Sequence, residues 1–208
     1  MTVRNKLALT AAALSTVALL AGCSSGSGAT ESPEPSSSSV NMHGAPKVRS
    51  PLDTKAFQQK PCSVLKPEQI GALNMQQWES EVDMGSTGGP KCAWRYMGGP
   101  PDYTVSSTAV TFMVESDGLK SSYFRKGKGV FEYFRELKPI VGYPAIAAGS
   151  STSTPEKEGQ CEVEVGVTDS LTFLTQVKFG NGSSYAGDPC GRARDVATEV
   201  VKTLKAGA

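Results

Sequence analysis

Five cysteines constrain this chain more than any other feature of its sequence: Cys23, Cys62, Cys92, Cys161 and Cys190. Since five is an odd number, at most four of them can pair within the chain. None lies in the C-x-x-C spacing that is typical of redox motifs and zinc sites. If the chain is exported, the four later cysteines are expected to form two disulfides.

The segment before Cys23 has the layout of an export signal. Arg4 and Lys6 supply a positive start, and residues 7–20 are almost wholly apolar. This apolar run is shorter than the ~20 residues that a helix needs to cross a bilayer. We therefore assign residues 1–22 to a signal peptide and exclude them from the fold.

This signal ends in Leu-Ala-Gly-Cys, which matches the lipobox of bacterial lipoproteins. In such signals the cysteine thiol receives a diacylglycerol and the peptidase cuts just before it. Cys23 is then the unpaired cysteine, and it attaches the chain to the extracytoplasmic face of the cell membrane. The alternative is a secretory signal with a chance cysteine, but charge, length and small residues all occur in the lipobox order.

Serine, glycine, proline and acidic residues dominate the stretch that follows Cys23. Such a composition buries too little apolar surface to offset the entropy of ordering. We interpret residues 23–59 as a flexible tether and residues 60–208 as one globular domain. His43, the only histidine, falls in the tether, where a solvated residue is favoured over a metal ligand.

The charge balance bears on the expected partners. After removal of the signal the chain carries 19 basic and 20 acidic side chains. This balance gives no reason to expect a nucleic acid as partner or a strong attraction to a membrane surface. No second apolar run reaches membrane-spanning length, so lipid is the expected anchor.

Local patterns predict an α+β domain, in which an antiparallel β-sheet is packed by N- and C-terminal helices. The last helix is the clearest element, because Asp188 is a candidate cap, Pro189 suits the first turn, and apolar residues follow at helical spacing. Alternating residues predict a hairpin that turns near residues 168–170. Other expected elements are a short helix over 66–74 and strands within 92–96, 102–116 and 141–149.

Several stretches, in the order LDTKAFQQKPCSVLKPEQIGAL, KCAWRY, VGYPAIAA, CEVEV and DPCGRARDVATEVVKTL, resemble a family of four-cysteine domains in actinobacterial lipoproteins. That family is catalogued as a domain of unknown function. The resemblance covers residues 50–205 and the lipobox, and Lys60 departs from it where an acidic residue is expected. It implies a cell-envelope protein, and it carries over no catalytic residue.

The disulfide connectivity follows only weakly from position. Cys62 and Cys190 fall at expected helix starts, and Cys92 and Cys161 fall at expected strand starts. Pairing like with like predicts 62–190 and 92–161, which is one of three connectivities that four cysteines allow.

Residues with catalytic potential are scarce. The lack of histidine after residue 60 excludes Ser-His-Asp, Cys-His and His-based zinc sites from the domain. Acidic clusters remain at 79–83, at 156–158 and at Glu162 and Glu164. Paired carboxylates suit glycoside hydrolysis only where they line a cleft, and we favour a solvated strand face instead.

One segment is a candidate binding patch. Residues 119–138 interleave aromatic residues with basic ones, among them Lys120, Arg125, Lys126 and Lys128. Such a surface suits an anionic wall polymer, a lipid headgroup or a partner protein. The alternative, which we favour here, places the aromatic rings in the core and the basic neighbours in solvent.

These observations predict a lipid-anchored envelope protein that acts as a non-catalytic binding or accessory module and uses no cofactor or metal. Its expected partners are the membrane, through a diacylglycerol on Cys23, and an envelope protein or wall polymer. The alternative function is a carboxylate-dependent hydrolase that acts on wall glycan or peptide.

Overall fold

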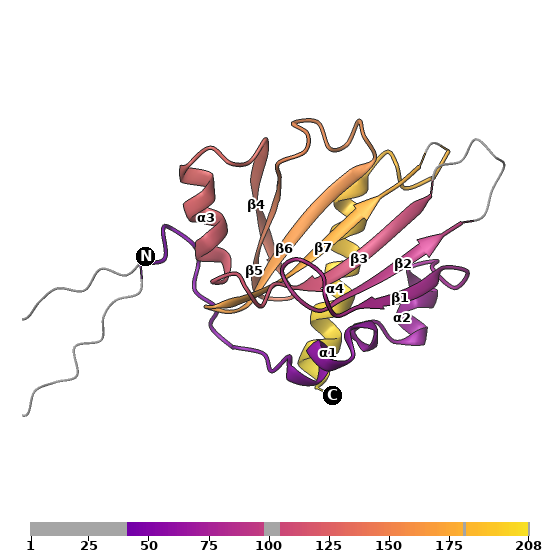
Figure 1. Cartoon of the computed structure of the whole chain (residues 1–208), viewed down its shortest axis with the longest axis horizontal. Coiled ribbons are helices and arrows are strands. Elements are labelled where there is room, and N and C mark those ends of the chain that lie inside the picture. Colours follow the sequence, from indigo (N-terminus) through magenta and orange to yellow (C-terminus); the bar gives the residue numbers. More distant parts are fainter. Residues whose placement is uncertain (1–40, 98–104, 181, 208) are drawn as a thin grey trace, which may run out of the picture. The chain divides into compact units, whose positions relative to one another are not determined.

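The computed structural model describes residues 41–97, 105–180 and 182–207, which lie in one compact unit. The predictions for the signal peptide, for Cys23 and for residues 24–40 fall outside the described residues. Within this unit a single sheet separates two layers of helix (Figure 1).

The sheet has seven strands in the order β1-β2-β3-β7-β6-β5-β4, and every neighbouring pair is antiparallel. The strands are β1 (Glu79–Asp83), β2 (Lys91–Tyr96), β3 (Ser106–Phe112), β4 (Tyr133–Ile140), β5 (Tyr143–Gly149), β6 (Gln160–Thr168) and β7 (Leu171–Lys178). The predicted strands and the predicted hairpin, β6–β7, are confirmed. β1 and β4 are additional edge strands that the sequence pattern did not predict.

The helices lie mainly at the two ends of the domain. They are α1 (Lys55–Gln59), the 3-10 helix η1 (Pro61–Val64), α2 (Pro67–Ala72), α3 (Leu119–Gly127) and α4 (Pro189–Ala206). α4 begins as predicted, because the carboxylate of Asp188 accepts a hydrogen bond of 2.9 Å from the backbone N–H of Gly191. The expected antiparallel sheet with terminal helices is therefore confirmed.

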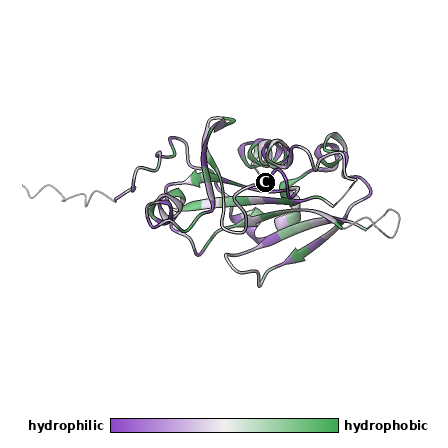
Figure 2. Ribbon diagram, turned by 90° about the horizontal axis from the view of Figure 1, so that it is seen from above, coloured by the Kyte–Doolittle hydropathy of each residue, from purple (hydrophilic) through white to green (hydrophobic). Residues whose placement is uncertain are grey.

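The core lies between α4 and one face of the sheet. Val163 and Val165 of β6 and Phe173 of β7 are fully buried there, as are Val196 and Val200 of α4. In Figure 2 α4 is seen nearly end-on above strands whose central parts are apolar. The alternate residues of β6 and β7 that point to α4 are apolar, which is why the hairpin pattern was visible in the sequence.

The opposite face of the sheet divides into two halves. α3 covers one half, where Leu119 and Tyr123 pack on Ile146 and Ala148 of β5. We call this region the covered half. Over β2, β3, β7 and the start of β6 the same face carries exposed or half-buried polar side chains, and we call it the open half. Its polar residues are Lys91, Arg95, Ser107, Gln160, Glu162, Gln176 and Lys178.

The folded unit begins before the expected boundary at residue 60. Residues 41–59, which we assigned to the tether, lie against the sheet and bury Ala45, Val48 and Phe57. The backbone N–H of Val48 donates to the carboxylate of Asp169 at 2.8 Å, and that of Leu52 donates to a strand carbonyl at 2.9 Å. Three scattered apolar residues in a polar stretch were too weak a signal to predict this packing.

The four domain cysteines form two disulfides, but the predicted connectivity is wrong. The bonds are Cys62–Cys92 and Cys161–Cys190, with Cα atoms 4.9 Å and 5.0 Å apart. Each joins a helix start to a strand, because η1 packs against β2 and α4 packs across β6. Pairing like with like failed because helices in this domain pack on the sheet.

Candidate functional site

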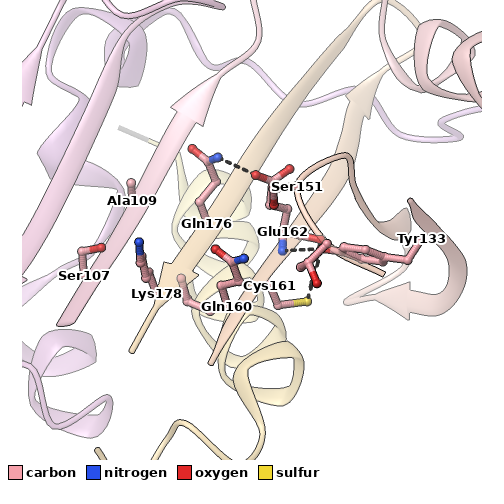
Figure 3. Close-up of a pocket in the computed structure, with 11 residues that line it drawn as sticks. Ser107, Ala109, Tyr133, Ser151, Gln160, Cys161, Glu162, Gln176 and Lys178 are labelled. Atoms are coloured by element: carbon pink, nitrogen blue, oxygen red, sulfur yellow. Dashed lines mark hydrogen bonds between the residues drawn. The ribbon is translucent and has the colours of Figure 1, made fainter. Parts of the chain in front are cut away.

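A cavity of about 240 Å³ opens on the open half of the sheet (Figure 3). Three neighbouring strands, β3, β7 and β6, form its floor. Tyr133 of β4 and the loop that precedes β6 form its wall. The lining residues are Ser107, Ala109, Tyr133, Ser151, Thr152, Gln160, Cys161, Glu162, Gln176, Val177 and Lys178.

The floor of the cavity combines both charges with neutral hydrogen-bonding groups. Glu162 and Gln176 are register partners, and the Gln176 amide donates to the Glu162 carboxylate at 2.8 Å. Lys178 pairs in register with Gln160 on one side and with Ser107 on the other. Within the described chain neither Glu162 nor Lys178 takes part in an ion pair. Both charges are therefore available to a ligand.

Tyr133 closes the cavity on the side of β4. Its hydroxyl accepts a hydrogen bond of 3.0 Å from the backbone N–H of Glu162. Burial raises the pKa of Tyr133, and its hydroxyl donates to the sulfur of Cys161 at 3.9 Å. The ring lies over Gly149, where an added Cβ would stand 2.7 Å from a ring carbon. Only glycine at position 149 allows this approach.

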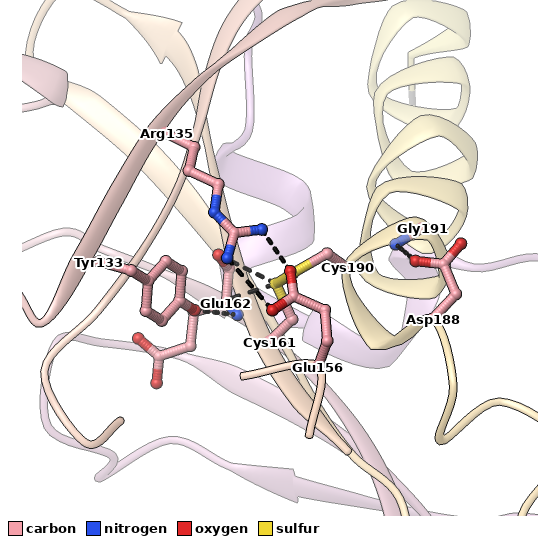
Figure 4. Close-up of a disulfide and its surroundings, with 8 residues drawn as sticks. All are labelled: Tyr133, Arg135, Glu156, Cys161, Glu162, Asp188, Cys190 and Gly191. Atoms are coloured by element: carbon pink, nitrogen blue, oxygen red, sulfur yellow. Dashed lines mark hydrogen bonds and ion pairs between the residues drawn. A yellow bond between two sulfur atoms is a disulfide. The ribbon is translucent and has the colours of Figure 1, made fainter. Parts of the chain in front are cut away.

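The loop wall is held in place by polar contacts (Figure 4). The Thr152 hydroxyl donates to Glu158 at 2.7 Å. Arg135 of β4 forms a two-pronged ion pair with Glu156 of the loop. Hydrogen bonding to the Arg135 guanidinium lowers the pKa of Glu156, and the pKa of Arg135 is raised by the same contact. The loop is thus tied to β4.

The Cys161–Cys190 disulfide lies beneath this site (Figure 4). Cys161 is the second residue of β6, and its neighbours on both sides line the cavity. The bond joins that end of β6 to the first turn of α4. The position of the floor therefore depends on the helix behind it.

A family model described as "Protein of unknown function (DUF3558)" matches residues 18–203. The chain belongs to this family. No curated protein and no solved structure gives a match. The family match includes the complete cavity, all four disulfide cysteines and the Leu-Ala-Gly-Cys sequence.

The basic residues of the predicted patch in this DUF3558 domain fall into two groups, those that form ion pairs and those that do not within the described residues. Lys120 is mostly covered and pairs with Asp117 at 2.8 Å, and Lys126 pairs with Glu136 at 3.3 Å. Arg125 and Lys128 are exposed and, within the described chain, have no carboxylate partner. The patch lies on α3, away from the cavity in the sheet.

The favoured interpretation, which places the aromatic rings of the patch in the core, is confirmed for some of these residues. Tyr123 and Tyr133 are buried, and Phe131 and Phe134 are partly buried. Phe124 departs from it, since 46% of its surface is exposed.

The acidic clusters are in three different environments. Those of β1 lie at the sheet edge, where Glu81 and Asp83 form ion pairs with β2. Glu162 lines the cavity. Glu164, two residues further on, lies under α3 and accepts hydrogen bonds from Ser122 at 2.6 Å and Thr172 at 2.8 Å. Burial raises the pKa of Glu164, against the lowering effect of these hydrogen bonds. The expected solvated face is therefore wrong for Glu164, whereas Glu162 lies on the open half of the sheet.

His43 lies on the domain surface and not in a free tether. It is exposed, and its ring lies 5.1 Å from that of Phe124. Among the described residues no group of three or more His, Cys, Asp or Glu side chains is arranged to hold a metal ion. In the same part of the chain no helix is long and apolar enough to cross a membrane.

Sequence reasoning missed most of the cavity: Ser107, Tyr133, Gln176 and Lys178. Alternate polar residues on two predicted strands were a usable signal, because Ser107, Gln176 and Lys178 all point away from the core. Tyr133 gave no such signal, since β4 was not predicted.

Proposed function

We propose that this protein is a lipid-anchored module of the actinobacterial cell envelope that binds a polar ligand in the sheet cavity without chemical change. Residues 1–22 act as its signal peptide, and Cys23 carries the diacylglycerol on the outer face of the cell membrane. The ligand is a neutral or zwitterionic part of a wall polymer, such as a saccharide or a short peptide.

Three observations support the anchor and the export that it requires. The Leu-Ala-Gly-Cys sequence combines a nucleophilic thiol with small residues before it. The family match starts at residue 18, so this sequence belongs to the part of the chain that the family shares. The two disulfides fit an exported protein, because disulfides persist in oxidising compartments.

The single observation that carries the binding proposal is the mixture of groups in the cavity. Glu162 suits a ligand cation, Lys178 suits a ligand anion, and Gln160, Gln176 and Ser107 offer neutral donors and acceptors. Sites for polar ligands use a few such groups at fixed positions. These groups lie on three hydrogen-bonded strands, so their spacing is rigid.

The same geometry supports binding over the alternative of carboxylate-dependent hydrolysis. That chemistry uses two carboxylates on either side of the bond that is cut. Glu162 is the one carboxylate among the cavity's lining residues, and Glu164 is held behind it by Ser122 and Thr172. A hydrolase would need a second acid from outside this cavity.

The anchor is tested by mass spectrometry of the mature amino terminus. We expect a diacylglycerol on Cys23 in the wild type and release or incomplete processing in a Cys23→Ala variant. An unmodified Cys23 in a chain that still fractionates with membranes would contradict the anchor.

Binding is tested by titrating soluble peptidoglycan fragments into the mature domain and following backbone amide NMR shifts. We expect shifts at Gln160, Glu162 and Gln176, and weaker binding by about tenfold in Lys178→Gln if one charged contact is lost. Arg95→Gln is the matched control, because Arg95 lies on the same face but outside the cavity lining. Chromatography of the fragments afterwards separates binding from hydrolysis, since cleavage would support the alternative.

A further inference from the structure

A second surface of the domain is built from α3 and the segment that leads into the domain. It comprises six basic residues and one aromatic residue, and we call it the basic face. Its members are Lys47, Arg49, Lys120, Phe124, Arg125, Lys126 and Lys128. α3 and the residues 41–49 lie side by side, since Met42 and Ala45 pack against Leu119 and Tyr123.

Shared neighbours make the basic face continuous. Lys47 and Arg49 line a cavity of about 600 Å³ together with Tyr123 and Glu136. The Lys126 ammonium lies 5.4 Å from the centre of the same Tyr123 ring. The face therefore extends from the entering segment across this hollow onto α3.

The other end of the face is also tied to the entering segment. Lys128 lies 5.4 Å from the Phe124 ring, which itself stands 5.1 Å from His43. Phe124 is 46% exposed although it is a large apolar residue. An apolar ring between cationic groups is the composition of surfaces that rest at a membrane interface.

The charge of the molecule is concentrated here. The basic face holds six basic side chains, and the acidic ones beside it are Asp117, Glu132 and Glu136, which leaves +3. Residues 41–208 as a whole carry 19 basic and 18 acidic side chains, so the remaining surface is net negative. A balanced protein with one positive face has a preferred orientation in front of an anionic surface.

The covalent link to the anchor leads to this same face. Only 17 residues separate Cys23 from Asn41, and fully extended they span at most about 60 Å. The chain enters the domain at Asn41, which lines a surface hollow with His43, Lys120 and Phe124. The basic face thus adjoins Asn41, the first described residue after this link.

We propose that the basic face rests on the anionic phosphate headgroups of the membrane that holds Cys23, with Lys47, Arg49, Arg125 and Lys128 on the phosphates and Phe124 at the interface. This deepens the proposed function and rests on its lipid anchor. The ligand cavity lies on the same face of the sheet as α3, in the open half that α3 leaves uncovered.

The test uses the mature chain, residues 23–208, with Cys23→Ser so that no lipid contributes. Flotation is measured with vesicles of phosphatidylcholine and with vesicles of equal parts phosphatidylcholine and phosphatidylglycerol. We expect binding to the anionic vesicles alone, and its loss when salt is raised from roughly 0.05 M to 0.5 M. Each basic residue contributes about a fivefold gain in partition to such a surface.

Two triple variants make the test specific to the face. In Lys47→Gln/Arg125→Gln/Lys128→Gln we expect partition to fall by roughly two orders of magnitude. The control, Lys55→Gln/Lys157→Gln/Arg194→Gln, removes the same charge from three exposed residues elsewhere and should partition like the parent. Equal loss in both variants would overturn the proposal, because net charge alone would then explain binding.

Phe124→Ser supplies a second measurement that leaves the charge unchanged, and we expect a smaller loss of partition. Soluble polyphosphate is the competing probe: if it binds the parent chain while anionic vesicles do not, the face serves a phosphate polymer and the membrane proposal is wrong. The lipid on Cys23 is measured separately by mass spectrometry, so failure of the anchor and failure of the face are distinguishable.

Discussion

The covered and open halves lie on one face of the sheet, yet their polar strand residues have different roles. What packs over a residue decides its role, and the sequence pattern does not. Glu162 and Glu164 are alternate residues of β6 and point to the same side. α3 covers Glu164, whose carboxylate accepts hydrogen bonds from Ser122 and Thr172. No such helix covers Glu162, which lines a cavity beside Gln176 and Tyr133. The same glutamate–valine alternation therefore yields one structural and one candidate ligand-binding carboxylate.

The largest expected effect concerns the disulfide beneath the open half. Cys161→Ala/Cys190→Ala opens a link between residues 29 apart and should lower the free energy of unfolding by about 2–5 kcal/mol. Guanidinium unfolding under oxidising conditions measures it. Since the bond fixes the cavity floor to α4, ligand binding should fall as well. A loss below about 1 kcal/mol would show that the floor is held by the strands alone.

The second expected effect tests whether α3 is what distinguishes the halves. Leu119 is buried between α3 and the sheet, so Leu119→Ala should cost about 2–4 kcal/mol of unfolding free energy. Leu174→Ala, in the open half, removes a partly buried side chain and should cost about 1 kcal/mol. Equal costs would mean that the open half is as well packed as the covered one.

The third prediction compares the two glutamates by pH. Burial raises the pKa of Glu164 in the folded protein, so folding favours its protonated form. Its contribution to stability is complete below the unfolded pKa of about 4.3 and is lost as the pH rises through the folded pKa.

The measurement is the difference in unfolding free energy between wild type and Glu164→Gln, followed from pH 4 upward. This difference should decline with pH, by at most about 1.4 kcal/mol per pH unit for a single proton. Glu162→Gln is the matched control on the same strand. The same decline in both variants would contradict the distinction between the halves.

The smallest effect is expected at the loop wall of the open half. Arg135 and Glu156 are both substantially exposed, so a double-mutant cycle with Arg135→Ala and Glu156→Ala should give a coupling of about 0.2–1 kcal/mol. Ligand affinity should respond more strongly than stability, because this pair holds the wall of the cavity. Unchanged ligand affinity in both variants would show that the loop is not part of the binding site.

Local sequence patterns were enough to predict those helices and strands whose own residues show a clear hydrophobic period or a cap. The β6–β7 hairpin alternates along its length, and α4 has both a cap and an apolar stripe, so each was predicted from neighbouring residues. β1 is exposed on both faces and β4 mixes polar and apolar residues, so neither has a clear period. Their place at the sheet edges depends on partners that are distant in sequence.

Tertiary packing alone decided the connectivity of the cysteines and the composition of the candidate site. Cys62 meets Cys92, and Cys161 meets Cys190, because η1 packs against β2 and α4 packs across β6. Likewise α3 covers Glu164 and leaves Glu162 open, although both follow the same alternation. A side chain's period along the strand determines the face to which it points, whereas only the packing of distant segments determines what covers that face.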